Sequence, residues 1–567
     1  MKSWKKSLSL LVCALMLATP LMACGEAANN EGTEQANGVL NQTGGNVSNA
    51  TDVAGNEITR PNYYEPPHEF RWVAYSTPPN ANVGSQGTAY EGNPDYNTVE
   101  HWQTLADCGF NYATPIHYDI TEEEKEKTLA NAEAVGVKIL FPSTDKTNPD
   151  SLGYISDQGG TYQEAYNRIL ANEGKIKARY AKFMKYESFA GIFGCDEPDA
   201  TKFEAIAAAQ DWFEDNYPEY EFYVNLLPEY ATNEQLFGKL NGQEGYESYA
   251  DHVARFCEIV NPYIMSYDHY CLKEAGGYFN GFFQNLAIVA NNTKLLEEAY
   301  NWEVPFYIYL QSMGFEFKSQ MKTYEHWSWQ VYNSLAFGVT GVQTFNYWPH
   351  MADKGNGNAT ITDALVNRQG EKTDAYDYVK KTIDDIRAME TVYLSYDWEH
   401  TSAWTKEGAS RSGLLSALNG WEGYVDVNDN NKNGNTTERL NWYTDISKIT
   451  TDQEILVGEF SNREKEANKA YFVSNASDIQ TPALMGASMY ASGERAKDIA
   501  KTYAANISLT FGNNVESVKL YKPSSTKPGS TKVDADAVIE VKTPVNGTVS
   551  FTIPLGEGFF VVPVYKA

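Results

Sequence analysis

From Phe70 onward the chain repeats one pattern of hydrophobic and polar positions. A short apolar run ends in polar or aromatic residues, a loop rich in Gly, Pro or Asn follows, and an amphipathic stretch comes next. The eight apolar runs are residues 70–75, 111–116, 137–141, 189–194, 222–227, 263–266, 306–310 and 341–345. Strands that alternate with helices form parallel sheets. Eight such units within residues 66–395 predict an α/β fold, a (β/α)8 barrel of the TIM type.

Helix signals lie where this pattern requires them. The helix after the first run should begin near Asn97–Thr98 and bury Val99, Trp102, Leu105 and Ala106. Residues 121–124 form a Thr-x-x-Glu capping box, and residues 374–393 read as the last helix. An open, doubly wound sheet is the alternative, but it would normally offer fewer strands and often a Gly-rich phosphate loop. The sequence contains no GxGxxG and no GxxxxGK[ST], so it predicts neither a nucleotide nor another cofactor.

The pattern of hydrophobic and polar positions changes after the barrel. Residues 396–567 are predicted to form short strands in which apolar and polar residues alternate. Examples are 455–460, 470–473 and 549–553, with Asn546–Gly547 as a hairpin turn. This half predicts a β-sandwich-like domain. Such a domain could bind sugar, but packing against the barrel is its more common role.

The N-terminus reads as a lipoprotein signal peptide over residues 1–23. Three lysines precede an apolar run from Leu8 to Leu17, and Leu21-Met22-Ala23-Cys24 follows. Cleavage before Cys24 would leave this cysteine for lipidation, and residues 24–65 read as a disordered tether. An ordinary signal peptide with a chance cysteine is one alternative. A membrane span is another, but the apolar run is too short to cross a bilayer comfortably. We therefore expect an exported protein, lipid-anchored to the bacterial cell membrane or surface.

Charge and cysteine usage exclude several classes of partner. With 45 Lys and Arg against 74 Asp and Glu, the formal net charge of −29 argues against nucleic acid. The remaining thiols show no CxxC spacing, so buried free thiols are expected, with one disulfide left open: Cys108, Cys195, Cys257 and Cys271. Residues 429–434 resemble the first half of a calcium loop, but Leu440 stands where that loop needs an acid. No metal site is predicted.

Reactive groups in such barrels stand at the C-terminal ends of the strands. The residues at these ends are carboxylates, amides, imidazoles and aromatic rings, a set suited to carbohydrate: Tyr75, His117, Asp196, Glu197, Asn225, Tyr267, Asp268, His269, Gln311, Tyr347 and Trp348. Glu197 is the predicted general acid, because glycoside hydrolysis needs a carboxylic acid to protonate the leaving oxygen. The competing interpretation is a helix start rich in acid, since Asp196, Glu197 and Asp199 all precede a helix beginning near Ala200.

The fourth strand end, Asp196-Glu197-Pro198, resembles that of clan A glycoside hydrolases, the β-galactosidase and cellulase type of barrel. In that family the motif is Asn-Glu or Asn-Glu-Pro with Glu as acid/base, and the resemblance implies this role for Glu197. The chain departs from the family at Asp196, which replaces Asn, and at Gln311, where the family has its nucleophilic Glu. Glu316 lies five residues further on and is a weaker candidate.

Asp268 is the second catalytic carboxylate that the sequence favours, with Asp196 as the next. Residues 265–268 read Met-Ser-Tyr-Asp and resemble the Met-x-Tyr-Asp of chitinase-type barrels, where the substrate's N-acetyl group attacks. Three functions remain open on this basis. A hydrolase of O-glycosidic bonds leads, a non-catalytic surface glycan-binding lipoprotein is the alternative from another class, and a chitinase-like hydrolase of N-acetylhexosaminides is the third.

Overall fold

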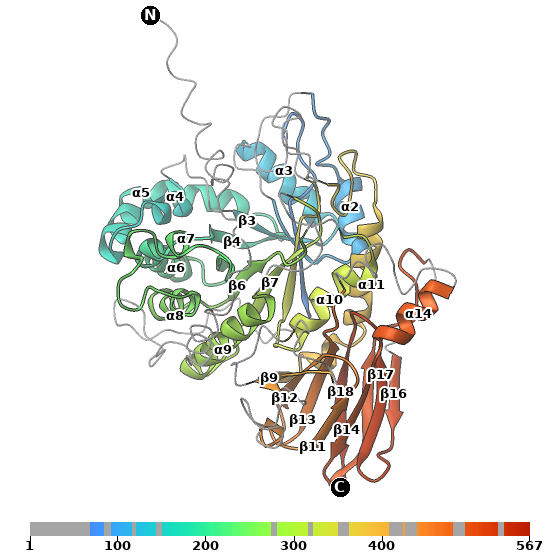
Figure 1. The fold of residues 1–567 in the computed structure, drawn as a ribbon. Helices are drawn as coiled ribbons and strands as arrows, with labels where there is room; N and C mark the ends of the chain where they lie inside the picture. The colour runs from blue at the N-terminus through green and yellow to red at the C-terminus, as the bar shows by residue number, and fades with distance from the viewer. Residues whose placement is uncertain are drawn as a thin grey trace, which may run out of the picture.

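The computed structural model describes residues 69–83, 92–115, 121–142, 150–273, 281–315, 321–349, 362–406, 415, 423–425, 439–479, 494–530 and 538–566. Figure 1 shows a ring of helices around a sheet, with a second, strand-rich part below it. The strands of the upper sheet are β1 (Arg71–Tyr75), β2 (Tyr112–Thr114), β3 (Lys138–Pro142), β4 (Phe189–Asp196), β5 (Glu221–Asn225), β6 (Met265–His269), β7 (Phe306–Gln311) and β8 (Gly341–Phe345).

These eight strands form the predicted parallel barrel. Their order is β5-β4-β3-β2-β1-β8-β7-β6. The last gap is closed between β5 and β6, where Leu226 N donates to Ser266 O (2.9 Å) and Asp268 N donates to Leu226 O (3.3 Å). The prediction of a (β/α)8 barrel is therefore confirmed. The sixth strand lies further along than its apolar run indicated, and the described part of the second strand is shorter.

Helices cover the outside of the barrel. They are α2 (Val99–Cys108), α3 (Glu122–Glu133), α4 (Leu152–Asp157), α5 (Tyr162–Phe183), η2 (Ala200–Lys202), α6 (Phe203–Asn216), α7 (Asn233–Phe237), η3 (Gly238–Leu240), α8 (Tyr249–Val260), α9 (Phe282–Tyr300), α10 (Tyr324–Leu335), α11 (Asp374–Arg387) and α12 (Glu390–Tyr393). The predicted capping box of α3 is present, with Thr121 and Glu124 bonded reciprocally. Two details differ from expectation: Val99 is 48% exposed, because it begins α2 on the solvent side, and the last helix is split into α11 and α12.

The inside of the barrel is filled by alternate strand residues. Its apolar layer contains Tyr75, Leu140, Phe193, Tyr223, Ile264, Tyr307 and Tyr309. At the N-terminal end of the barrel, Arg71 and Glu221 form a two-bonded ion pair with N–O distances of 2.5 and 2.8 Å. The Arg71 guanidinium lies 3.9 Å from the ring centroid of Tyr112 and 4.9 Å from that of Tyr307. This pair fills the end of the barrel opposite the strand termini where chemistry is expected.

The C-terminal part is a sandwich of two sheets. Its elements are β9 (Tyr396–Trp404), β10 (Tyr424–Val425), β11 (Ile446–Thr451), β12 (Ile455–Asn462), β13 (Lys469–Asn475), α14 (Glu494–Tyr503), β14 (Ala505–Phe511), β15 (Val515–Lys522), β16 (Val538–Lys542), β17 (Thr548–Ile553) and β18 (Gly558–Tyr565). A sheet of order β10-β9-β12-β13-β18-β15-β16 faces a three-stranded sheet, β11-β14-β17, and the two share one core. The predicted turn is present, since Asn546 and Gly547 have φ of 52° and 77°.

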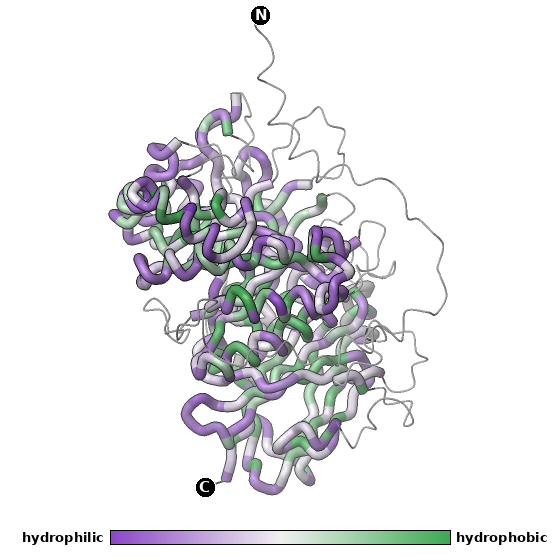
Figure 2. The backbone as a smooth tube through the Cα atoms, turned by 90° about the vertical axis from the view of Figure 1, so that its left-hand side faces the viewer, coloured by the Kyte–Doolittle hydropathy of each residue, from purple (hydrophilic) through white to green (hydrophobic). Residues whose placement is uncertain are grey.

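The central strands of the larger sheet, β12, β13 and β18, are buried on both faces, which explains their nearly continuous apolar runs. In β12, Ile455 and Val457 point into the sandwich core, whereas Leu456 and Phe460 belong to the core shared with the barrel. Helix α10 lies in that shared core, and all twelve of its residues are buried. Figure 2 shows apolar segments running through the middle of the molecule and polar ones on the outer helices. The sandwich thus packs against the barrel, as expected.

The four cysteines in the described residues are buried free thiols, in agreement with the sequence. None of the helices in the described part of the chain has the length and apolar character needed to span a bilayer. Cys24 and the loop at residues 429–434 lie outside the described residues, and so does His117.

Candidate active site

The end of β4 presents Glu197 in an unusual backbone conformation. Its φ is 47°, in the left-handed region that a residue with a side chain adopts only at a cost. Its N–H donates to the carbonyl of Asn225 at 2.8 Å, which fixes this turn to β5. Asp199, two residues on, accepts from Thr201 N at 3.0 Å and caps η2. Capping at the start of a helix therefore explains the acidic residue Asp199. It does not explain Glu197.

Asp268 lies at the end of β6 and is 1% exposed. Glu197 is the neighbouring carboxyl group that acts on it most strongly. Burial, followed by the negative charges of Glu197 and Asp196, raises the pKa of Asp268 well above its ordinary value. The Asn225 amide opposes this shift by donating to Asp268 Oδ1 at 3.1 Å. Three carboxyl groups thus meet at the C-terminal mouth of the barrel.

Asn225 connects the three carboxyl groups from β5, between the other two strands. Its Nδ2 also faces Asp196 Oδ1 at 3.4 Å, a weaker contact than that with Asp268. On its other side, Ser266 Oγ donates to Asn225 Oδ1 at 2.9 Å. The structure therefore brings together four of the predicted site residues: Asp196, Glu197, Asn225 and Asp268.

The closeness of Glu197 and Asp268 bears on the prediction that Asp268 is the second catalytic carboxylate. A nucleophile lies about 5 Å from the acid in retaining glycosidases, and a water-activating base lies about 6.5 to 9.5 Å away in inverting ones. Asp268 is 1% exposed and its charge interacts with that of Glu197, which favours control of Glu197 over direct attack on the substrate.

The side-chain amide of Gln311, at the end of β7, is bonded to the backbone of Leu272. Its side chain is fully buried, its Oε1 accepts from Leu272 N at 2.9 Å, and its Nε2 donates to Leu272 O at 3.3 Å. The residue therefore joins the end of β7 to the segment after β6. Nothing is described of Glu316, which lies among residues 316–320 outside the described part.

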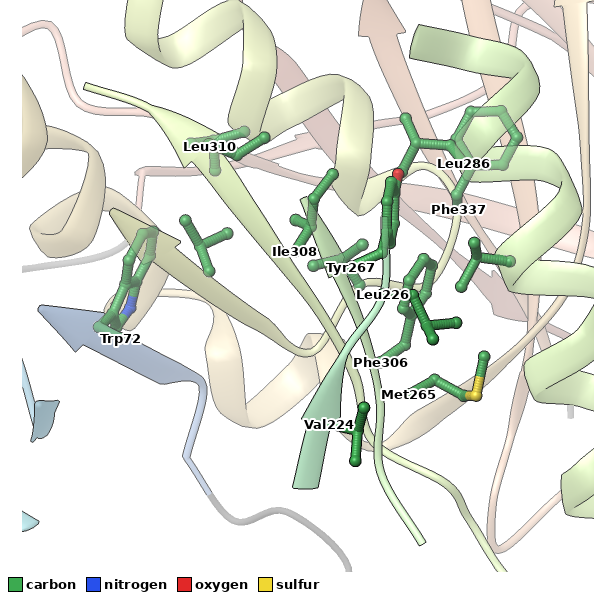
Figure 3. Close-up of a cluster of buried hydrophobic side chains, with 14 of the residues drawn as sticks. Trp72, Val224, Leu226, Met265, Tyr267, Leu286, Phe306, Ile308, Leu310 and Phe337 are labelled. Atoms are coloured by element: carbon green, nitrogen blue, oxygen red, sulfur yellow. The ribbon is translucent and has the colours of Figure 1, made fainter. Parts of the chain in front are cut away.

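Tyr267 and His269 point out of the barrel instead of into its mouth, which corrects their predicted binding role. Side chains alternate along a strand, so they lie on the face opposite Ser266 and Asp268. Tyr267 is fully buried and stacks on Phe306, and Figure 3 shows it among the apolar side chains of the surrounding core. His269 Nδ1 is bonded to Asn285 in α9. The chitinase-like interpretation needed Tyr267 beside Asp268 at the mouth, and it loses that support.

The predicted aromatic residues of β8 and β1 also serve packing. Trp348 is fully buried, with its ring centroid 4.9 Å from that of Tyr96 beside α2. Tyr347 is buried with its ring edge-on to Phe110. Tyr75 points into the barrel, where its ring packs on Tyr309 and Phe345. Of the three, only Tyr75 belongs to the layer below the mouth.

Other aromatic side chains, which the sequence interpretation did not select, line the mouth. Tyr270 and Phe345 are partly exposed, with ring centroids 4.8 Å apart, and Phe315 packs on both. Tyr230 lies on the other side, where its hydroxyl accepts from Tyr270 N at 3.4 Å. The charges of Asp268 and Glu197 act on both tyrosines and contribute to the raised pKa of each, after burial. Side chains alternate in direction along β6 and into the residue that follows it. Because Asp268 faces inward, this alternation predicts that Tyr270 also faces inward.

Within the described residues, no three His, Cys, Asp or Glu side chains are grouped so that they could hold a metal ion. The chemistry available at this mouth is that of carboxyl, amide and phenol groups beside partly exposed aromatic rings.

Comparison with known proteins gives a distant resemblance. No protein-family model and no curated protein sequence matches the chain. Among solved structures, it is similar to a β-galactosidase from the psychrophilic Marinomonas ef1 with 9% identity and a TM-score of 0.38, over 58% of this chain and 62% of that one. It is similar to a glucosidase from Croceicoccus marinus with 10% identity and a TM-score of 0.37, over 89% and 98% of the two chains. An α-amylase from Anoxybacillus shares 7% identity and a TM-score of 0.43, over 88% and 98%.

Proposed function

We propose that this protein hydrolyses O-glycosidic bonds of oligo- or polysaccharides, with Glu197 as the general acid. The contact between Glu197 and the buried Asp268 carries this proposal. A general acid must keep its proton near neutral pH, and a second carboxyl in contact favours retention of one proton. Tyr270 and Phe345 supply partly exposed rings beside the pair, on which a sugar face can stack.

In the proposed reaction, the pair donates its proton through Glu197 to the bridging oxygen as the bond from that oxygen to the anomeric carbon breaks. A water molecule supplies the new hydroxyl on that carbon, and its remaining proton goes to a carboxylate. Asp196 is the described candidate for this acceptor, because it is half-buried at the mouth and Asn225 orients it. Proton exchange with solvent then restores both groups.

A panel of polysaccharides and aryl glycosides tests the proposed activity. Protein that begins at Gly25 is incubated with each compound, and the released sugar is measured by chromatography. We expect release from at least one compound. Retention on a glycan without release from any compound would contradict hydrolysis.

Non-catalytic binding of a glycan is the second candidate function. The burial of Gln311 and its bonds to Leu272 favour it, since the end of β7 then offers an amide where the resembled family has its nucleophile. In this case the aromatic mouth would hold sugar, and replacing Glu197 would change affinity only.

We further propose that the protein is exported and anchored by a lipid on Cys24, as its N-terminal sequence indicates. Replacing Cys24 by Ala should move the protein from the membrane fraction to the soluble fraction when both are compared by immunoblot. Persistence of Cys24→Ala in the membrane fraction after a salt wash would contradict the anchor.

A further inference from the structure

We propose that the buried Asp268 carboxyl shares one proton with Glu197, in an orientation fixed by a hydrogen-bond chain inside the barrel. Asp268 is then a positioning residue that controls the protonation of Glu197 without touching the substrate. The inference rests on the proposed function, because it concerns the proton that Glu197 donates.

The chain of bonds has a defined direction. Gln343 Nε2 donates to Ser266 Oγ at 2.9 Å, and the hydroxyl of Tyr223 donates to Gln343 Oε1 at 3.3 Å. An amide nitrogen only donates, so the Ser266 hydroxyl must direct its own proton to Asn225 Oδ1, 2.9 Å away. The amino group of Asn225 is thereby turned toward Asp268. The hydrogen bonds inside the barrel thus determine that the amino group of Asn225, and not its oxygen, faces the Asp268 carboxyl.

This direction determines which Asp268 oxygen holds the proton. Oδ1 accepts from Asn225 at 3.1 Å, and an oxygen that carries a proton is the poorer acceptor. Oδ2 is buried, has no conventional hydrogen-bond donor in the described part of the protein, and belongs to a carboxyl in contact with Glu197. Two ionised carboxylates in contact would repel, whereas one shared proton converts the contact into a short, charge-assisted hydrogen bond. The proton therefore lies between Oδ2 and Glu197.

The other titratable groups around Asp268 leave this proton to the carboxyls. Asp196 adds a third carboxyl at the end of β4. Four tyrosines from β6, α8 and the segment after β5 interact with the Asp268 charge, and burial raises the pKa of each well above its ordinary value: Tyr230, Tyr249, Tyr267 and Tyr270. These phenols stay neutral in the range where the pair titrates.

The pair should control the alkaline side of the pH profile. Activity requires the shared proton, so activity is lost as pH rises through the raised pKa of the pair. In Asp268→Asn the second negative charge is absent, and the Asn amide, oriented by Asn225, donates to the Glu197 carboxylate. The pKa of Glu197 then falls, and the alkaline limb of kcat/KM moves to lower pH.

The test compares kcat/KM against pH for the wild type and Asp268→Asn. We expect a shift of the alkaline limb by about one pH unit or more, which is about a tenfold loss per unit on that limb and a smaller loss on the acidic side. Ser266→Ala, which breaks the chain, should move the limb to higher pH, because it weakens the donation from Asn225 that lowers the pKa of Asp268. Ser474→Ala is the matched control, because it removes a buried serine bond to Asn333 far from the mouth. An equal loss at every pH would overturn the inference.

Carbon-13 NMR of protein labelled at its Asp carboxyls gives a readout without substrate. Burial also raises the pKa of Asp377 and Asp397, so the Asp268 resonance is assigned as the one that disappears in Asp268→Asn. In the wild type it should titrate above the ordinary range of Asp, and in Glu197→Gln it should move toward that range. Absence of such a resonance from the wild type would overturn the shared proton. A raised resonance together with full activity of Glu197→Gln would support the shared proton and refute the proposed function, so the two failures are distinguishable.

Discussion

Glu197→Gln should hydrolyse an unactivated glycoside about two to four orders of magnitude more slowly than the wild type, the usual contribution of general acid catalysis. Gln has nearly the same shape as Glu and can keep the contact with Asp268, but it has no proton to give to a leaving alkoxide. The loss should be smaller for an aryl glycoside with a good leaving group, because that oxygen departs without protonation. The measurement is initial rate against leaving-group pKa for both proteins.

Asp199→Asn is the matched control for this variant. It removes one negative charge from the same segment, and Asn caps a helix as well as Asp does, so the bond to Thr201 N can persist. We expect near-normal turnover from it. Near-normal turnover of an unactivated glycoside by Glu197→Gln would remove Glu197 from the mechanism and leave Asp196 as the acid to test.

Arg71→Met should lower the free energy of unfolding by about 3–5 kcal/mol, the usual cost of leaving one charge of a buried ion pair without its partner. The side chains of Arg71 and Glu221 are only 16% and 8% exposed, so Glu221 would gain little hydration in the variant. The packing of Arg71 on Tyr112 and Tyr307 would also be lost. Urea denaturation followed by tryptophan fluorescence measures the change.

The double variant Arg71→Met/Glu221→Leu separates charge from packing. With both charges removed, most of the loss should be recovered, because apolar replacements of a buried pair are often close to neutral. Lys127→Met is the exposed comparison. It breaks the pair with Asp95, whose partners are 40% and 41% exposed, and should cost less than about 1 kcal/mol. Equal losses from Arg71→Met and Lys127→Met would show that the buried pair has no special importance.

The fold could be predicted because its strands are buried on both faces. The run at 306–310 is apolar throughout and becomes β7. The run at 341–345 becomes β8 and is buried over most of its length, although Gln343 and Thr344 are polar. The sixth strand was placed too early, at 263–266, because its later residues are polar. In the structure, Asp268 and His269 still belong to β6, where the backbone pairs with β7 and the polar side chains bond within the protein.

The site could be predicted only in part, because the sequence does not give the direction of each side chain. Glu197, Asp196, Asn225 and Asp268 were identified from their positions after apolar runs. The pairing of β4 with β5 has a register irregularity between Phe193 and Cys195, just before Glu197, which no periodicity reveals. Tyr267 was selected for its aromatic ring, although the alternation along β6 turns it toward the helices and turns Tyr270 toward the mouth.

The complete burial of α10 makes the sandwich part of the support of the barrel. One side of this helix faces the barrel at β7, and the other faces the sandwich, where Tyr332 stacks on Phe472 and Asn333 bonds Ser474. A fragment ending at residue 395 would expose this helix to water, so the two halves are not interchangeable modules. Exchange of the C-terminal half would remove part of the barrel's own core, so the loops at the mouth are the segments that can vary without disturbing it.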